Sequence, residues 1–283
     1  MNKLLCAFAI LAASAAPSIV HAACTELSLP TTISSPGNYC LAADYTTADP
    51  VEKSIEIAAS DVTVDCQGHR LTSNANSNSG TSVAIFANNR HDITVHDCRI
   101  MGGYSIGIDI LQNNSGPNAN YYVTLADNYI GGPYLYGIRA YGSAIEILRN
   151  HIYDVGGQLN SHAAGIRIGA GTGFGFHLLK ENLIAGTNTP YTNAFGILSD
   201  KSVASIFIGN GVTGSSASNT AYHGYGIRIL TGSGNRITDN HVNGSGRSND
   251  VGITTNDTAS SCFDNYIRAA TKTATCNASL GNY

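Results

Sequence analysis

The sequence predicts an all-β protein, a right-handed parallel β-helix of about seven or eight coils. Three observations predict this fold. Two short motifs, Gly-Ile and Asn-x-Ile/Val, alternate strictly along the chain. Successive copies of the Gly-Ile motif recur at unequal steps of 23 to 31 residues. Short segments between the motifs alternate apolar and polar residues, which is the period of a half-buried β-strand.

The Gly-Ile motif marks the first strand of each copy. Ala84-Ile85 is a weaker first example. A variable loop follows, and then a strand of period two such as residues 145–147. The full copies are Gly107-Ile108, Gly137-Ile138, Gly165-Ile166, Gly196-Ile197, Gly226-Ile227 and Gly252-Ile253.

The asparagine motif marks a corner, because the inward phase of the side chains shifts there. Asparagines at the same corner of successive coils can hydrogen-bond along the stack and satisfy backbone groups. We therefore predict a structural ladder and no catalytic role for this column, which Cys98 begins. Its members are Asn128, Asn150, Asn182, Asn210, Asn240 and Asn265.

Three short strands per copy cannot bury a face alone, but stacked copies can. Propeller blades need longer repeats, and leucine-rich repeats need a leucine ladder that is missing. A left-handed hexapeptide helix would keep a strict six-residue step. A right-handed β-helix tolerates unequal loops because insertions emerge at its corners.

The chain begins with a predicted secretory signal over residues 1–22, in which Lys3 precedes an apolar run over residues 4–16. We expect a secreted or periplasmic protein, with lipidation at Cys24 left open. Residues 23–50 show no repeat and are predicted to be an N-terminal cap. The repeats extend over 51–267, and residues 268–283 are predicted to be a C-terminal tail.

The composition argues against nucleic acid and membrane as binding partners. The formal net charge is −4 and only 12% of residues are charged, which gives no support to nucleic-acid binding. No later stretch is long and apolar enough to be a membrane span. We expect a monomer, and no cofactor and no metal site are predicted.

Six cysteines follow the signal segment. An even number in an exported chain predicts disulfides. We predict Cys24–Cys40 and Cys262–Cys276, because each closes a loop of about 15 residues and fastens a terminal region. The pairing of Cys66 with Cys98 is left open, because parallel side chains on neighbouring coils do not lean toward each other.

The segment over residues 33–71 contains Pro-Gly-Asn-Tyr-Cys-Leu (36–41), Ile-Glu-Ile (55–57) and Asp-Val-Thr-Val-Asp-Cys-Gln-Gly-His (61–69). It resembles the opening of bacterial right-handed β-helix proteins of the pectate-lyase-like superfamily, including NosD-like periplasmic proteins. The resemblance becomes diffuse toward residue 267. It implies the fold strongly and the function weakly, since the superfamily holds lyases, hydrolases, epimerases and adhesins. The arginine motif of calcium-dependent pectate lyases and the aspartate motifs of polygalacturonases are not matched.

The residue after each Gly-Ile is predicted to point outward, and three of these residues are arginines. An arginine row suits a repeating carboxylate, as in a uronic-acid chain. The column is Asp109, Arg139, Arg167, Leu198, Arg228 and Thr254. Three residues before each glycine a second column contains Tyr104, Tyr134, His162, Asn193, His223 and Asn249.

Abstraction of a proton beside a uronate needs charge neutralisation, a base and an acid. We therefore name His162, Arg167 and His223 as candidate catalytic residues. Arg139, Arg228, Tyr104 and Tyr134 are candidate substrate-binding residues. The alternative is that outward arginines only solvate the sheet. A stripe of mainly acidic residues before the ladder asparagines is predicted to be corner residues, with a shared cation or glycoside hydrolysis as alternatives.

The sequence thus predicts an exported protein that binds or processes a polysaccharide, with an acidic glycan favoured. If it is an enzyme, it is a polysaccharide lyase, an epimerase or a glycoside hydrolase. The first alternative is a non-catalytic structural or adhesive scaffold. A metal-delivery accessory protein is a distant alternative, since the chain has two methionines and no histidine spacing typical of a metal site.

Overall fold

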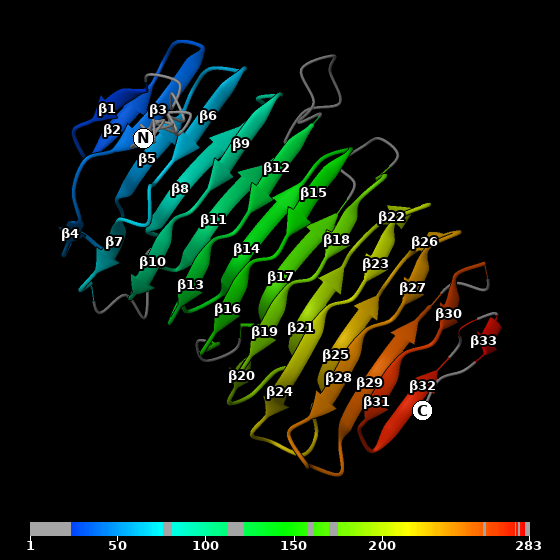
Figure 1. Ribbon diagram of the computed structural model, residues 1–283. Coiled ribbons are helices and arrows are strands. Elements are labelled where there is room, and N and C mark those ends of the chain that lie inside the picture. The colour runs from blue at the N-terminus through cyan, green and yellow to red at the C-terminus, as the bar shows by residue number, and fades with distance from the viewer. Residues whose placement is uncertain are drawn as a thin grey trace, which may run out of the picture.

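The computed structural model describes residues 24–75, 81–111, 122–157, 161–169, 175–256, 259–274, 276 and 278–280. The predicted signal segment therefore lies outside the described residues. The chain forms a right-handed parallel β-helix of about eight turns, as predicted. Successive coils stack from the N-terminal to the C-terminal end (Figure 1). In the described part of the chain, no helix is long and apolar enough to cross a membrane.

Each coil contributes one strand to each of three parallel sheets. Sheet A contains β1 (Thr25–Leu27), β3 (Gly37–Leu41), β6 (Val62–Asp65), β9 (Ile93–His96), β12 (Val123–Ala126), β15 (Ile145–Leu148), β18 (Leu178–Lys180), β23 (Ile206–Ile208), β27 (Arg236–Thr238), β30 (Ser261–Phe263) and β33 (Ala278–Leu280). Sheet B contains β2 (Thr31–Ile33), β5 (Lys53–Ile57), β8 (Val83–Asn88), β11 (Ile106–Leu111), β14 (Tyr136–Tyr141), β17 (Ala163–Gly169), β21 (Ala194–Ser199), β25 (Gly224–Ile229), β29 (Asp250–Thr255) and β32 (Thr271–Ala274).

Sheet C follows the asparagine corner. It contains β4 (Tyr45–Thr47), β7 (Arg70–Ser73), β10 (Arg99–Gly102), β13 (Tyr129–Gly131), β16 (His151–Tyr153), β19 (Leu183–Ala185), β24 (Gly211–Ala217), β28 (His241–Gly244) and β31 (Tyr266–Arg268), with β20 (Asn188–Thr189) paired to β24. A small separate sheet pairs β22 (Ser202–Val203) with β26 (Gly232–Ser233).

The glycine of the Gly-Ile motif packs against the isoleucine of the Asn-x-Ile motif inside the same coil. A Cβ atom at Gly137 would lie 2.4 Å from Cγ2 of Ile152, and one at Gly165 would lie 2.3 Å from Cγ2 of Ile184. Both isoleucines belong to the Asn-x-Ile motif of sheet C. Any side chain in place of these glycines would overlap a buried isoleucine, so sheet B and sheet C can close around the core only where glycine stands.

The corner between sheets A and C depends on a residue with positive φ immediately before the ladder position. Such values lie in the left-handed region, which breaks the alternation of a strand and accounts for the phase shift seen in the sequence. The residues are Asp97 (54°), Asp127 (57°), Arg149 (52°), Glu181 (56°), Gly209 (65°), Asp239 (56°) and Asp264 (51°).

The asparagines at this corner form a continuous buried ladder. Nδ2 of Asn128 donates to Oδ1 of Asn150 at 2.9 Å and to the carbonyl of Val95 at 3.1 Å. Oδ1 of Asn150 also accepts the backbone N–H of Asn128 at 3.1 Å. Each ladder asparagine up to Asn240 donates to the amide oxygen of the next at 2.9 to 3.0 Å. The ladder expected from the sequence therefore satisfies both side-chain amides and corner backbone groups.

A second polar column, which the sequence motifs do not mark, lies inside the coil at the opposite end of the sheet A strands. The backbone N–H groups of His177, Ser205 and Asn235 each donate to the side chain at the same position one coil on. These side chains and Ser260 are buried. The members of this column stand five residues before the ladder asparagines, and this constant spacing is the sequence feature from which the column could have been predicted.

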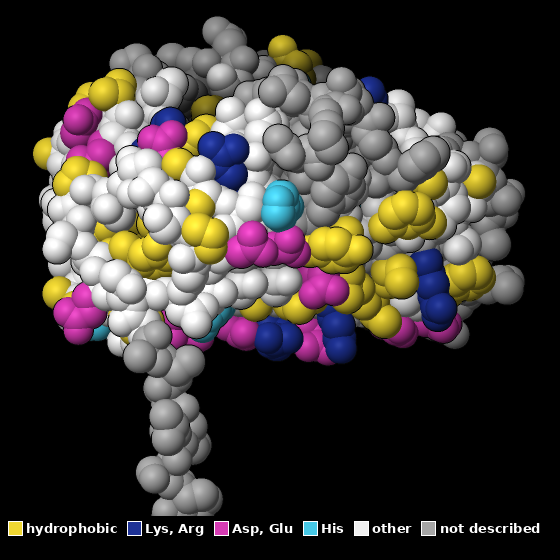
Figure 2. Space-filling view, turned by 90° about the horizontal axis from the view of Figure 1, so that it is seen from above, with side chains coloured by type: hydrophobic (Ala, Val, Ile, Leu, Met, Phe, Trp, Pro, Cys, Tyr) yellow, Lys and Arg dark blue, Asp and Glu magenta, His cyan; other side chains and the backbone are white. Residues whose placement is uncertain are grey.

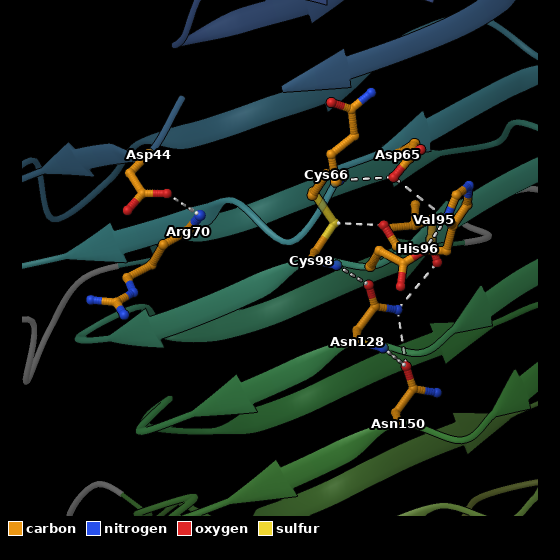
Figure 3. Close-up of a disulfide and its surroundings, with 11 residues drawn as sticks. Asp44, Asp65, Cys66, Arg70, Val95, His96, Cys98, Asn128 and Asn150 are labelled. Atoms are coloured by element: carbon orange, nitrogen blue, oxygen red, sulfur yellow. Dashed lines mark hydrogen bonds and ion pairs between the residues drawn. A yellow bond between two sulfur atoms is a disulfide. The ribbon is translucent and has the colours of Figure 1, made fainter. Parts of the chain in front are cut away.

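The structure contains the two predicted disulfides, Cys24–Cys40 and Cys262–Cys276. It also pairs Cys66 with Cys98 at a Cα separation of 4.7 Å (Figure 3). The residue with positive φ comes before Cys98 but after Cys66, at Gln67 (52°). The two Cβ bonds are therefore not equivalent, which removes the objection drawn from parallel side chains.

The regions expected to be a cap and a tail also supply strands. β1, β2 and β4 pair with β3, β5 and β7, so all three sheets begin before residue 51. At the other end β32 pairs with β29, and β33 pairs with β30. Backbone pairing at the ends does not require the repeat motifs, because no further coil has to pack against them.

A candidate anion site on the outer face of sheet B

The strand register places the predicted arginine row on the outer face of sheet B, with one residue per coil. Asp109 pairs with Arg139, Arg139 with Arg167, Arg167 with Leu198, and Leu198 with Arg228. Neighbouring positions are about 4.8 Å apart, the separation of strands in a sheet. The three arginines of the row are half-buried, and they have different electrostatic surroundings.

Arg139 is neutralised within the coil stack. Its Nε and Nη2 each donate to Asp109 at 2.7 Å in a bidentate pair. Asp109 is only 2% exposed, and this burial raises the pKa of its carboxyl, against the opposing effect of Arg139. A buried carboxylate needs such a partner, so Arg139 is committed to Asp109.

Arg167 is neutralised by a loop residue. Its Nε donates to Oδ2 of Asp200 at 2.8 Å, and its Nη1 donates to the hydroxyl of Tyr136 at 2.6 Å. The hydroxyl of Tyr141 also donates to Asp200. Burial and the neighbouring carboxylate raise the pKa of Tyr141 well above its ordinary value. Tyr141 therefore stays protonated at neutral pH and is a poor base.

Arg228 forms no ion pair among the described residues. Its Nε is shielded from solvent and has no hydrogen-bond partner in the part of the chain that the structure describes. The guanidinium carbon lies 4.3 Å from the ring centroid of Tyr225, and Tyr225 stacks on Phe195 at 5.2 Å. Arg228 is thus held against an aromatic face while its charge and one buried N–H remain uncompensated.

An apolar layer lies beneath this row, outside the sheet. It was not predicted, although every member except Leu198, which belongs to the row, stands directly before a Gly-Ile motif or before its weaker first copy at Ala84-Ile85. Long arginine side chains cover the layer with their apolar stems. Its buried members are Val83, Ile106, Tyr136, Ala164, Phe195, Leu198 and Tyr225.

The structure does not bring the three candidate catalytic residues together. His162 and His223 are exposed. Their rings contact Phe195 and Tyr225 at centroid distances of 5.7 and 5.6 Å. Five strand residues, about 16 Å, separate His162 from Arg167 along the chain. Neither histidine has a hydrogen bond to an arginine of the row among the described residues.

Tyr104, named as a candidate substrate-binding residue, is not on the surface. Tyr104 is fully buried in the main core, and its hydroxyl lies 2.8 Å from the hydroxyl of Ser54. The corner that precedes sheet B turns this side chain inward. Tyr134, one coil on, is partly exposed, and its backbone N–H donates to the carbonyl of Tyr104 at 3.0 Å.

A hollow of about 310 Å³ opens at the N-terminal end of the row. Lys53, Phe86, Leu135 and the Asp109–Arg139 pair lie along it. Lys53 is itself paired with Glu56 at 2.8 Å. The hollow therefore presents apolar walls with charges that are already matched.

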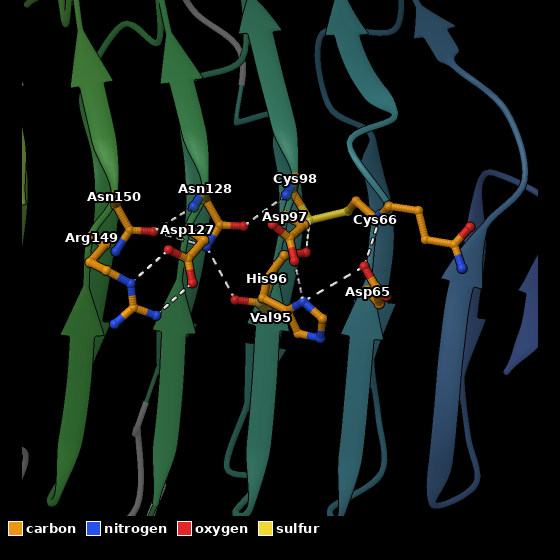
Figure 4. Close-up of polar contacts among 11 residues, drawn as sticks. Asp65, Cys66, Val95, His96, Asp97, Cys98, Asp127, Asn128, Arg149 and Asn150 are labelled. Carbon is orange, nitrogen blue, oxygen red and sulfur yellow. Dashed lines mark hydrogen bonds and ion pairs between the residues drawn. A yellow bond between two sulfur atoms is a disulfide. The ribbon is translucent and has the colours of Figure 1, made fainter. Parts of the chain in front are cut away.

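Among the described residues, two histidine–aspartate groups at the ends of the sheet A strands could hold a metal ion. In one, Nδ1 of His96 lies 2.8 Å from Asp97 and 3.6 Å from Asp65 (Figure 4). Asp61, His91 and Asp92 form the other, and in both groups the ligand atoms lie within 4.8 Å of one another. On the face seen in Figure 2, a histidine lies directly beside acidic side chains.

The rest of the acidic stripe is interrupted by cations. Arg149 forms a bidentate pair with Asp127 at 2.8 and 2.6 Å, and Lys180 lies 3.3 Å from Glu181. The stripe is therefore not a row of facing carboxylates, and the distances give no support to the glycoside-hydrolysis alternative.

No family model and no curated protein matches the chain. Among solved structures, an alginate lyase from Paenibacillus sp. strain FPU-7 shares 12% identity, with 87% of this chain and 91% of that chain covered and a TM-score of 0.38. The Agl-KA catalytic domain shares 11% identity, with 88% and 62% covered and a TM-score of 0.35. Likeness at this level carries no argument about the activity of this chain.

Proposed function

We propose that this protein binds an acidic polysaccharide on the outer face of sheet B, where Arg228 receives a carboxylate of the chain. The observation that carries the proposal is the uncompensated guanidinium of Arg228. An unpartnered N–H shielded from solvent is costly and uncommon in folded proteins. A carboxylate at the guanidinium would supply the missing charge, and a turn of the arginine side chain would let its shielded Nε donate to the same group.

Neighbouring residues support binding in preference to catalysis. Arg139 and Arg167 are already paired with Asp109 and Asp200, so they hold the face in place. A lyase or an epimerase would need a base beside the sugar ring. The hydroxyl of Tyr141 is held by Asp200, and the two histidines precede strands β17 and β25, with their rings against Phe195 and Tyr225. The arrangement therefore favours a glycan-binding protein over an enzyme.

The same proposal includes export. Disulfides persist in oxidising compartments, and this chain forms three of them among its described residues. Together with the predicted signal over residues 1–22, they support a secreted or periplasmic protein that meets extracellular or envelope polysaccharides.

The test is a titration with an oligouronate, comparing the wild type with Arg228→Gln. We expect the variant to weaken binding at this face by about tenfold or more, which corresponds to about 1.4 kcal/mol. Arg236→Gln, an exposed arginine on sheet A, removes the same charge and should bind as the wild type. Equal affinity of Arg228→Gln and the wild type would contradict the proposal.

A second assay addresses the catalytic alternative directly. The wild type is incubated with a panel of uronans while the absorbance of an unsaturated product is followed. Because Asp200 holds the hydroxyl of Tyr141, and neither His162 nor His223 is hydrogen-bonded to an arginine of the row among the described residues, we expect no product. Steady product formation would favour a polysaccharide lyase.

A further inference from the structure

Sheet C carries a second surface that the proposed function does not use. Its outer face presents Arg70, Arg99, Tyr129 and His151 in register on four successive coils. Tyr153 lies beside them, two residues after His151. We call these five residues the arginine–tyrosine platform. The distance from Arg70 to His151 is three coil rises, or about 14 Å.

The aromatic part of the platform is a packed structure. Gly131 has no side chain, and a Cβ atom there would lie 2.2 Å from the ring of Tyr153. The ring of Tyr153 therefore lies over Gly131, and its hydroxyl is 3.2 Å from Sδ of Met101. Tyr129 contacts Tyr153 and His151 at centroid distances of 4.9 and 4.8 Å.

This aromatic group faces solvent. Tyr129 is 38% exposed, whereas Tyr136, Phe195 and Tyr225 on sheet B are at most 9% exposed. Burial, followed by the hydrogen bond with Tyr129, raises the pKa of Tyr153 to about 12. Its hydroxyl therefore stays neutral and adds no negative charge to the platform.

The two arginines provide the positive charge of the platform. Arg70 and Arg99 are both exposed, and neither forms an ion pair among the described residues. The nearby carboxylate of Asp44 accepts the backbone N–H of Arg70 at 2.9 Å, while the side chain of Arg70 extends away from it (Figure 3). Two like charges on neighbouring coils repel each other, and a bound anion would relieve this repulsion.

We propose that the arginine–tyrosine platform is a second binding surface for an acidic glycan chain lying along the β-helix axis. Arg70 and Arg99 receive carboxylates, and sugar rings lie against Tyr129, His151 and Tyr153. Charge complementarity and exposed rings identify this occupant, since guanidinium pairs bidentately with carboxylates and aromatic faces accept the apolar face of a sugar ring. The surface belongs to a different sheet from Arg228, so the inference does not depend on that site.

The experiment counts binding sites on the intact protein by calorimetric titration with a purified oligogalacturonate of six units. The wild type should bind two oligomers per chain. Arg70→Gln with Arg99→Gln should bind one, and so should Arg228→Gln. The charge-matched control is Lys201→Gln with Arg236→Gln, two exposed positions outside sheet C, which should keep both sites.

Two further measurements test the roles within the platform. Tyr129→Ala should weaken the platform site at least about fivefold for both the oligogalacturonate and its carboxyl-reduced form, because ring stacking does not need the charge. The arginine double variant should lose affinity only for the charged form. Circular dichroism confirms that each variant is folded.

The outcomes separate the two proposals. If Arg228→Gln keeps two sites while the arginine double variant keeps one, the sheet B proposal fails and the platform stands. If the double variant binds two oligomers with wild-type affinity, the platform proposal is overturned. Loss of affinity that is equal in the charge-matched control would also overturn it, because net charge alone would then explain the binding.

Discussion

The residue before each ladder asparagine has a positive φ, and this conformation accounts for the acidic stripe along the corner. Aspartate tolerates the left-handed region better than most residues, because its short side chain can bond the local backbone. Asp97, Asp127, Asp239 and Asp264 all take it with φ between 51° and 57°. The stripe is therefore explained by backbone conformation, as the corner interpretation of the sequence predicts.

His177 is the residue whose burial has the clearest consequence. It is 2% exposed inside the coil, and neither ring nitrogen has a hydrogen-bond partner among the described residues. Burial lowers its pKa from 6.5 to about 4, because the charged imidazolium would be isolated from water. The folded protein therefore holds this histidine neutral.

We predict that His177 makes the fold sensitive to mild acid. Since the folded pKa is lowered, the unfolded chain takes up the proton first as the pH falls below 6.5. Stability should be complete above that pH and decline toward pH 4. The difference between the two pKa values corresponds to roughly 3 kcal/mol.

The measurement is urea unfolding at pH 7.5 and pH 4.5 for the wild type and for His177→Asn. Asparagine already occupies this column at Asn235. Carboxylates titrate equally in both proteins, so their contribution cancels. The variant should lose markedly less stability between the two pH values, and an equal loss in both proteins would show that His177 does not titrate in this range.

At the scale of elements, one corner of the coil is fixed by hydrogen bonds and another by a close approach. The asparagine ladder joins sheet A to sheet C, and the Gly-Ile strands close sheet B over the isoleucines of sheet C. Asn182 stands in the middle of the ladder. Its Nδ2 donates to Ile147 at 2.7 Å and Asn210 at 2.9 Å, and its Oδ1 accepts two bonds from Asn150 at 3.0 Å.

We predict that Asn182→Leu destabilises the fold by about 3 kcal/mol, because it leaves several buried polar groups of the neighbouring coils unpaired. Urea unfolding at pH 7.5 measures this change. Asn243→Leu is the control, since Asn243 lies on the outer face of sheet C, where its side-chain amide contacts the exposed His241 at 2.9 Å. Its effect should stay within about 0.5 kcal/mol. Equal stability of Asn182→Leu and the wild type would refute the role of the ladder.

The strands and the ladder could be predicted because every coil repeats the same local contacts. Glycine beside isoleucine and asparagine after a left-handed residue recur because the same contact recurs, so the three strands of each coil and the ladder follow from the sequence. Contacts between unlike residues have no such signal. The pairing of Asp200 with Arg167 joins a loop to a strand 33 residues away. The inward turn of Tyr104 depends on a corner that the motifs do not mark.

For the same reason, the position of the arginine row on sheet B could be predicted from the sequence, but the ion pairing of each arginine could not. Arg139, Arg167 and Arg228 occupy equivalent positions of the repeat, and only the structure shows that the first two are paired with carboxylates. The motifs did not reveal the platform on sheet C either, because its residue type changes from arginine at Arg70 and Arg99 to tyrosine and histidine on the next two coils.

At the scale of the whole molecule, two of the three disulfides lie at the ends of the coil stack and the third lies in its interior. Cys24–Cys40 and Cys262–Cys276 close loops of 16 and 14 residues in the terminal coils. Cys66–Cys98 spans 32 residues, and both of its cysteines are fully buried. The backbone N–H of Cys98 donates to Oδ1 of Asn128 at 3.1 Å, so this disulfide continues the ladder as a covalent rung.

We predict that the interior disulfide stabilises the whole fold, whereas a terminal one stabilises only its own end. Solenoid coils contact only their neighbours, so loosening β33 leaves the remaining coils stacked, but loosening the Cys66–Cys98 rung separates two coils that the others depend on.

In the chain-entropy model a closed loop of the length between Cys66 and Cys98 contributes roughly 4 kcal/mol. Cys66→Ala with Cys98→Ala should lower the global free energy of unfolding by about that amount. Cys262→Ala with Cys276→Ala should change it little, and should instead speed hydrogen exchange in β30 to β33 alone. Urea unfolding and hydrogen exchange followed by peptide mass spectrometry measure both effects. Faster exchange across all coils in the terminal variant would mean that the stack unfolds as one cooperative unit from its end, and the division between interior and terminal disulfides would then be wrong.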